Sequence, residues 1–273
     1  MLSGARLGLA ATAAVLAAGA WYWHAQGRLP DGVTLLAGGD AGGLARAEPA
    51  AEGFDAAAVK AATDLARDQQ ASALLVMRHE HLVIEQYGGH GGPQALVDGG
   101  DLALALAQLA AAAGPGAAAG PGGAAGPGGA AGPGAAAAID PQVLSARIWR
   151  PLNAAPAQYV TATGQIRARA GDWLRVAGLL LQDGRFEGTQ VLPVGAVRRV
   201  PLASVESGTQ LLRGPGGTRL WLVPRLALAV LRIGPESATG AVDETRLPAL
   251  LAGAVRERPA ATAPALGDLV TGH

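Results

Sequence analysis

The chain of 273 residues contains no cysteine and is poor in aromatic residues, lysine and serine. Without cysteine, disulfide bonds and thiolate chemistry are both excluded. Aromatic residues make up 4% of the chain and hydrophobic residues 50%, so alanine supplies much of the apolar count and the core is smaller than that count suggests. Twenty of the 21 basic residues are arginine, and Lys60 is the single lysine. Any mechanism that requires a lysine must therefore use Lys60.

The charges cancel, with 21 basic and 21 acidic residues, whereas a nucleic-acid-binding protein needs a basic patch. Glycine and proline are abundant instead, at 41 and 18 residues. Part of this excess lies in a tract over residues 114–138, where Gly-Pro-Gly recurs every six residues. The stretch of this tract with glycine at every third position is too short for a collagen helix. We therefore expect a flexible, disordered insert, because little besides alanine in this tract could enter a core.

The N-terminal segment Leu7–Trp23 carries no charge over seventeen residues and ends in Trp21-Tyr22-Trp23. This length is at the short end for a membrane-spanning helix, and aromatic residues of this kind concentrate at membrane interfaces. We expect residues 1–27 to be a signal anchor that spans the inner membrane through residues 7–23, with the domain facing the periplasm. A signal peptide cleaved after Ala18-Gly19-Ala20 is the alternative. Residues 28–53 are expected to be a linker.

The remaining pattern predicts an α+β domain over residues 54–256, followed by a flexible tail over residues 257–273. Residues 56–69 are expected to form a helix, and residues 72–78 and 82–87 a β-hairpin. The expected N-caps are Asp55, Asp140 and Asp172. Either Asp98 or Asp101 is expected to open the helix that begins near residue 102. The other expected elements are helices over residues 102–113, 141–149, 173–183 and 243–256 and strands over residues 218–223 and 226–233.

Five segments, taken in their order along the chain, are similar to segments of one known protein family. They are Phe54–Tyr87, Ile148–Leu152, Ala170–Pro193, Leu220–Pro224 and Asp243–Pro248. Together they cover about a quarter of the chain. They resemble the serine β-lactamase and penicillin-binding-protein-like hydrolases, a group that includes class C β-lactamases, related esterases and 6-aminohexanoate-dimer hydrolases. The resemblance implies an antiparallel sheet covered by N- and C-terminal helices, with the family's helical subdomain largely missing.

The catalytic motifs of that family are absent. Its chemistry uses Ser-x-x-Lys at the start of a helix, Tyr-x-Asn, and Lys or His before Gly on an edge strand. The matching stretch Leu96–Leu104 contains neither serine nor lysine, and the residue three before Lys60 is alanine. Neither Tyr87 nor Tyr159 begins Tyr-x-Asn, and Arg213–Thr218 stands where the last motif would fall. The resemblance therefore implies a degenerate member of the family that has lost catalysis.

A cluster of histidines and carboxylates is the strongest remaining candidate site. The residues His79, Glu80, His81, Glu85 and His90 are of metal-ligand types but match no zinc spacing, so an exposed polar turn is preferred. A hydrolase with a rearranged, metal-assisted site in this cluster, acting on an ester, amide or β-lactam, is the alternative.

Three further features have structural interpretations. Ser204 and Ser207 lack the Gly-x-Ser-x-Gly elbow, and Gly214–Gly217 is expected to be a turn. The buried anchors expected in the core are Trp149, Trp173 and Trp221. The sequence thus assigns no catalytic, cofactor-binding or metal-binding residue, and a cell-wall or protein ligand is left unidentified.

Overall fold

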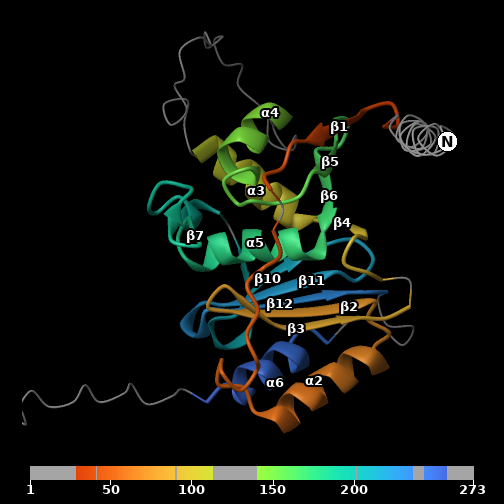
Figure 1. Ribbon diagram of the computed structural model, residues 1–273, viewed down its shortest axis with the longest axis vertical. Helices are drawn as coiled ribbons and strands as arrows, with labels where there is room; N and C mark the ends of the chain where they lie inside the picture. Colours follow the sequence, from red (N-terminus) through yellow and green to blue (C-terminus); the bar gives the residue numbers. More distant parts are fainter. Residues whose placement is uncertain are drawn as a thin grey trace, which may run out of the picture.

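The computed structural model describes residues 29–40, 42–89, 91–112, 140–200, 202–235 and 243–256. Its centre is an antiparallel sheet of six strands in the order β3-β2-β12-β11-β10-β9. Figure 1 shows this sheet between two layers of helices. The strands are β2 (Ala73–Arg78), β3 (His81–Tyr87), β9 (Ala203–Ser204), β10 (Gln210–Arg213), β11 (Arg219–Val223) and β12 (Leu228–Ile233).

The expected hairpin is confirmed as β2 and β3. Its turn consists of His79 and Glu80, both with positive φ, at 48° and 67°. This is the backbone of a two-residue type I′ turn, whose twist matches that of the flanking strands. The apolar run of β2 has no polar alternation because both faces are covered: Leu75 and Met77 face one core, and Leu74 and Val76 face the other.

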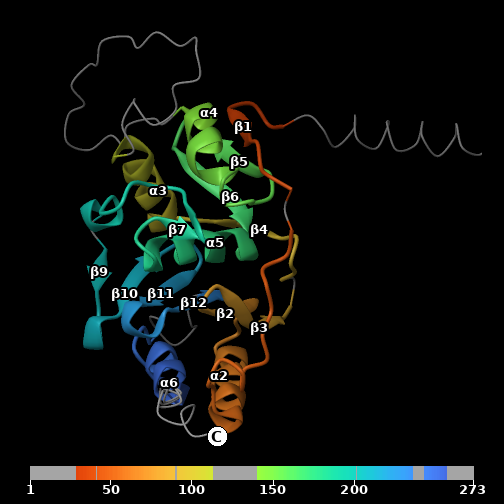
Figure 2. The same ribbon diagram turned by 60° about the vertical axis from the view of Figure 1, so that its left-hand side comes forward.

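One face of the six-stranded sheet is covered by helices from the two ends of the domain. Helix α2 (Ala56–Asp68) packs against helix α6 (Arg246–Ala254). Asp55 caps α2 as expected, because its carboxylate accepts hydrogen bonds from the backbone N–H groups of Ala57 and Ala58. Figure 2 shows both helices on the same side of the sheet. The predicted α+β class, with terminal helices covering an antiparallel sheet, is confirmed.

The opposite face is covered by helix α5 (Ala170–Leu181). The prediction that Asp172 caps this helix is wrong: the helix begins at Ala170, three residues earlier than expected, after extended Arg169. Asp172 is instead buried in the first turn, where its Oδ1 accepts a hydrogen bond of 3.0 Å from the Ala155 N–H. The three tryptophans expected in the core are buried, and Trp149 and Trp173 meet edge to face.

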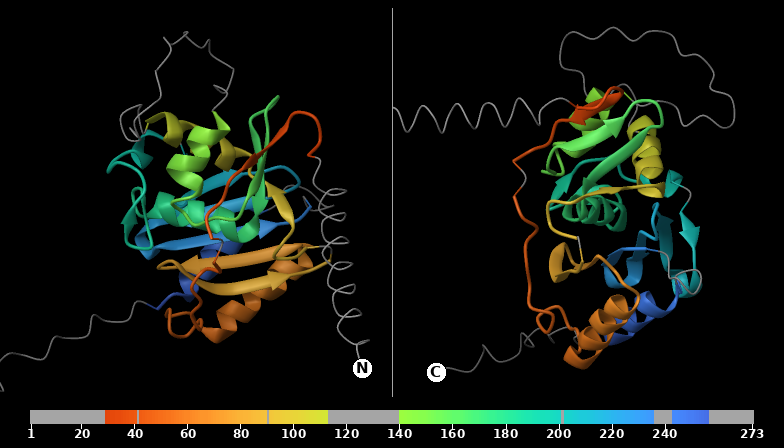
Figure 3. Two further views of the ribbon diagram at one scale, coloured as in Figure 1. Left: turned by 45° about the horizontal axis from the view of Figure 1, so that its top comes forward. Right: turned by 90° about the vertical axis from the view of Figure 1, so that its right-hand side faces the viewer.

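A second antiparallel sheet lies beyond α5, in the order β1-β5-β6-β4 (Figure 3). Its strands are β1 (Val33–Leu36), β4 (Leu96–Asp98), β5 (Ala157–Val160) and β6 (Gln165–Arg169). Strand β1 falls within residues 28–53, so the linker expected there is corrected in part. The chain after β1 also packs on the domain, since Leu82 of β3 exchanges hydrogen bonds with the backbone of Ala45 and Ala47.

Two further helices complete this layer. Helix α3 (Asp101–Ala112) follows β4. Helix α4 (Pro141–Leu144) is capped by Asp140 and continues into one turn of π-helix (Ser145–Trp149). A small hairpin, β7 (Arg185–Phe186) and β8 (Thr189–Gln190), follows α5. The predicted Gly-Pro tract between α3 and α4 and the predicted tail lie outside the described residues. So does the predicted anchor; no helix of the described part is long and apolar enough to cross a bilayer.

Candidate functional site

The start of α3 faces the end of β10, the two places where the family resemblance would put catalytic residues. The Asp101 carboxylate accepts a hydrogen bond of 2.9 Å from the Arg213 backbone N–H. Asp98 fixes the turn before the helix, because its Oδ1 accepts from the Gly100 N–H at 3.0 Å. Both carboxylates that could open the helix are therefore used to hold the backbone in place.

Two glycines allow this close approach. A Cβ atom on Gly100 would lie 2.5 Å from the Arg213 carbonyl oxygen, and the φ of Gly100 is +50°. A Cβ atom on Gly99 would lie 2.4 Å from the ring of Trp173. That ring is held in turn by a hydrogen bond from its Nε1 to the Val97 carbonyl. Larger side chains are thus excluded from the junction by sterics.

Beyond this junction, Glu244 binds two arginines. Arg213 donates to its carboxylate from Nε and from a terminal nitrogen, at 2.8 and 2.5 Å, and Arg219 donates from Nε at 2.8 Å. The hydrogen bonds from Arg213, and then those from Arg219, hold the pKa of Glu244 below its ordinary value. The same contact raises the pKa of Arg213. The guanidinium of Arg213 is therefore committed to an internal ion pair.

A hollow of about 160 Å³ lies between α3 and β10. Asp101 and Leu104 have the spacing of Ser-x-x-Lys and both line it, and Leu104 is 45% exposed. The other lining residues are Ala105, Gln108, Val200, Leu202, Ala203, Leu211 and Leu212. The hollow therefore offers one carboxylate and one amide among apolar side chains, with neither a nucleophilic hydroxyl nor an amine among its lining residues.

The residues that could have replaced the missing motifs lie elsewhere. Lys60 is on α2, across the sheet from α3, and pairs with Asp64 at 2.5 Å. Tyr87 is on β3, at the edge of the sheet remote from β10, and donates to Glu85. Tyr159 is buried in the core around the second sheet. Ser204 is exposed on β9, and its hydroxyl donates to the Val205 backbone carbonyl.

Two histidines of the cluster lie against a carboxylate that the sequence pattern did not include. The Nδ1 atoms of His79 and His81 lie 2.9 and 3.0 Å from the two carboxylate oxygens of Glu52. Glu80 points away to accept a hydrogen bond from the Glu187 N–H. Within the described ranges, no group of three or more ligating residues could hold a metal ion, and His90 lies outside them. The metal-assisted alternative thus gains no support from this part of the chain.

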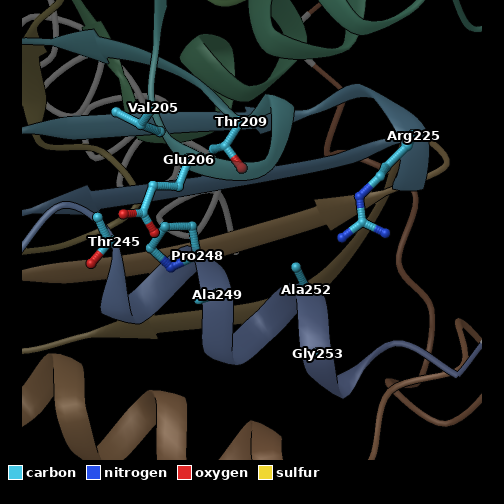
Figure 4. Close-up of a pocket in the computed structure, with 9 residues that line it drawn as sticks. All are labelled: Val205, Glu206, Thr209, Arg225, Thr245, Pro248, Ala249, Ala252 and Gly253. Carbon is cyan, nitrogen blue, oxygen red and sulfur yellow. The ribbon is translucent and has the colours of Figure 1, made fainter.

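A separate hollow of about 230 Å³ lies between α6 and the segment that leads into β10. Figure 4 shows Arg225 near one end of it and Glu206 near the other, above the helix. Thr209 and Thr245 supply the only hydroxyl groups among its lining residues. The hollow is on the α6 side of the sheet and does not join the α3 junction.

The fold is that of the serine β-lactamase-like hydrolases. A solved structure from Bacillus anthracis assigned as a 6-aminohexanoate-dimer hydrolase matches with a TM-score of 0.55 and 15% identity, over 81% of this chain and 88% of that one. A structure from Bacteroides dorei assigned as a β-lactamase matches with a TM-score of 0.48 and 10% identity, over 74% of this chain and 99% of that one. No protein-family model and no curated protein matches the chain.

Proposed function

We propose that this chain is a membrane-anchored, exported β-lactamase-like domain without catalysis, which acts as a binding or scaffolding module in the periplasm. The observation that carries the proposal is the junction of α3 and β10. There the family chemistry would need a serine and a lysine, and the chain places Asp101 and Leu104 beside the hollow.

The ion pairs at this junction support the same conclusion. A hydrolase of this kind needs donors that are free to stabilise the charge that develops on the carbonyl oxygen. Arg213 is the cation whose backbone meets the start of α3, and its side chain is bound by Glu244. A serine nucleophile would also need a base within hydrogen-bond reach. Neither serine nor lysine is among the residues that line the hollow, and its one carboxylate, Asp101, already accepts a hydrogen bond from the Arg213 backbone N–H.

The experiment is a direct assay of the purified chain. We expect nitrocefin turnover, hydrolysis of a 6-aminohexanoate dimer and covalent labelling by a fluorescent penicillin to match a heat-denatured control. Labelling above that control would overturn the proposal. If activity is found, replacing His79, His81 and His90 by alanine tests the rearranged site, since only a metal-assisted mechanism in this cluster would lose metal and activity together.

A further inference from the structure

The end of the domain where the described chain begins has a distinct surface. We define the β1–α4 end as strand β1, helix α4 and the turn to Arg150. A hollow of about 610 Å³ opens here between the strand and the helix. Leu35 is 52% exposed beside it. Arg150 is exposed at the rim, and Arg147 also lines the hollow.

The length of chain between the expected membrane segment and β1 limits where this end can lie. That segment ends at Trp23, and the described chain starts at Leu29. Six residue steps span about 20 Å at most, even when fully extended. Leu29 is four residues from β1. The β1–α4 end therefore cannot be far from a bilayer that holds the anchor, whereas α2 and α6 lie at the opposite end of the molecule's longest axis (Figure 1).

We infer that the β1–α4 end docks on the phospholipid surface that holds the anchor, with Leu35 in the interfacial region and Arg150 against lipid phosphate. This rests on the anchor in the proposed function. A leucine gains from leaving water, and an arginine matches phosphate with two parallel hydrogen bonds.

Acidic groups at the same end set the lipid requirement. Asp31 is exposed, and Asp140 uses its carboxylate to cap α4. These charges offset the two arginines, so we expect docking on zwitterionic phospholipid as well as on anionic lipid. The phosphate group common to both is the ligand.

Because the chain has no cysteine, a single introduced cysteine can be labelled at one chosen site. The full chain carries a single cysteine, either Ala146→Cys at the β1–α4 end or Ala61→Cys on α2 as the matched control; both alanines are exposed on helical turns. Each thiol receives a small fluorophore, and the protein is reconstituted into phosphatidylethanolamine–phosphatidylglycerol vesicles that contain a headgroup-nitroxide lipid. Circular dichroism confirms that each variant is folded.

We expect the label at residue 146 to lose most of its fluorescence and the label at residue 61 to lose none beyond that seen without nitroxide. Adding Leu35→Asp or Arg150→Glu should reduce the loss at residue 146. Flotation of the vesicles after a carbonate wash tests the anchor separately. If the protein floats with the vesicles but the two labels are quenched equally, the docking is overturned and the anchor stands. The same holds if a second copy of the chain shields residue 146 from the lipid. If the protein does not float, both the anchor and the docking are overturned.

Discussion

Glu244 connects parts of the chain that are distant in sequence. Its carboxylate binds Arg213 of β10 and Arg219 of β11, and its backbone carbonyl accepts a hydrogen bond from the Trp221 indole. The Arg219 side chain is buried, whereas Glu244 retains 22% exposure. A single carboxylate thus pairs with two guanidinium groups beside the start of α3.

Replacing Glu244 with glutamine should lower the free energy of unfolding at pH 7 by about 1.5–3 kcal/mol, the range for hydrogen bonds to charged groups. The amide keeps the shape of the side chain but removes the negative charge that both guanidinium groups face. Urea denaturation measures the change. The matched control is Glu48→Gln at an exposed position, for which we expect a change within about 0.5 kcal/mol.

The pH dependence of this difference follows from the lowered pKa of Glu244. A carboxyl group whose pKa is lower in the folded protein contributes stability above its unfolded pKa, and that contribution is lost as pH falls through the folded pKa. The gap in stability between the wild type and Glu244→Gln should therefore be full at pH 7 and shrink below about pH 4.3. Urea titrations at several pH values check this, and a gap that widens in acid would contradict it.

At the scale of elements, the position of α3 depends on Gly100. Gly100→Ala forces a Cβ atom to 2.5 Å from the Arg213 carbonyl at a positive φ, and should cost about 2–3 kcal/mol. Gly253→Ala is the control, because nothing lies within 4 Å of the place its Cβ would take in α6 and alanine favours a helix by about 0.5–1 kcal/mol. Thermal unfolding of both variants measures the difference; equal shifts would show that α3 is not packed on β10.

The elements that the sequence predicts well are those with a local signal. Helix α2 has a capping aspartate and an apolar face, and the β2–β3 hairpin has two apolar runs around a two-residue turn. Strand β1 has only four residues, and its partner β5 is about 120 residues away, so no local pattern identifies it. Asp172 resembles a cap in sequence, but its role depends on Ala155, which only the folded chain brings to it.

Residue counts predict which groups the candidate site lacks, but no sequence pattern predicts which side chains contact each other there. Counting residues already excludes Ser-x-x-Lys, since there is one lysine. By contrast, Glu244 and Arg213 are 31 residues apart, and Glu52 and His79 are 27 apart. Buried Arg232 has no sequence signal either, although its guanidinium binds the backbone carbonyls of Gly217, Gln69 and Pro235. Pairings between distant segments have no periodic signature.

For the whole molecule, the Gly-Pro tract is predicted to be dispensable for folding. Helices α3 and α4 on either side of it contact each other directly in the described structure. Deleting residues 114–134 should leave the melting temperature within about 4 °C of the wild type, because a shorter loop changes only the closure entropy, by roughly 1 kcal/mol. Calorimetry measures this. A large drop would show that the tract packs on the domain.

The most direct test of the proposal that no serine at the α3–β10 junction can be acylated is intact-mass spectrometry of the chain. The chain is first incubated with a β-lactam whose acyl-enzyme is hydrolysed slowly. We expect an unmodified mass, with nitrocefin hydrolysis equal to that of the heat-denatured control. A stoichiometric acyl adduct on the folded chain, lost on denaturation before incubation, would contradict it.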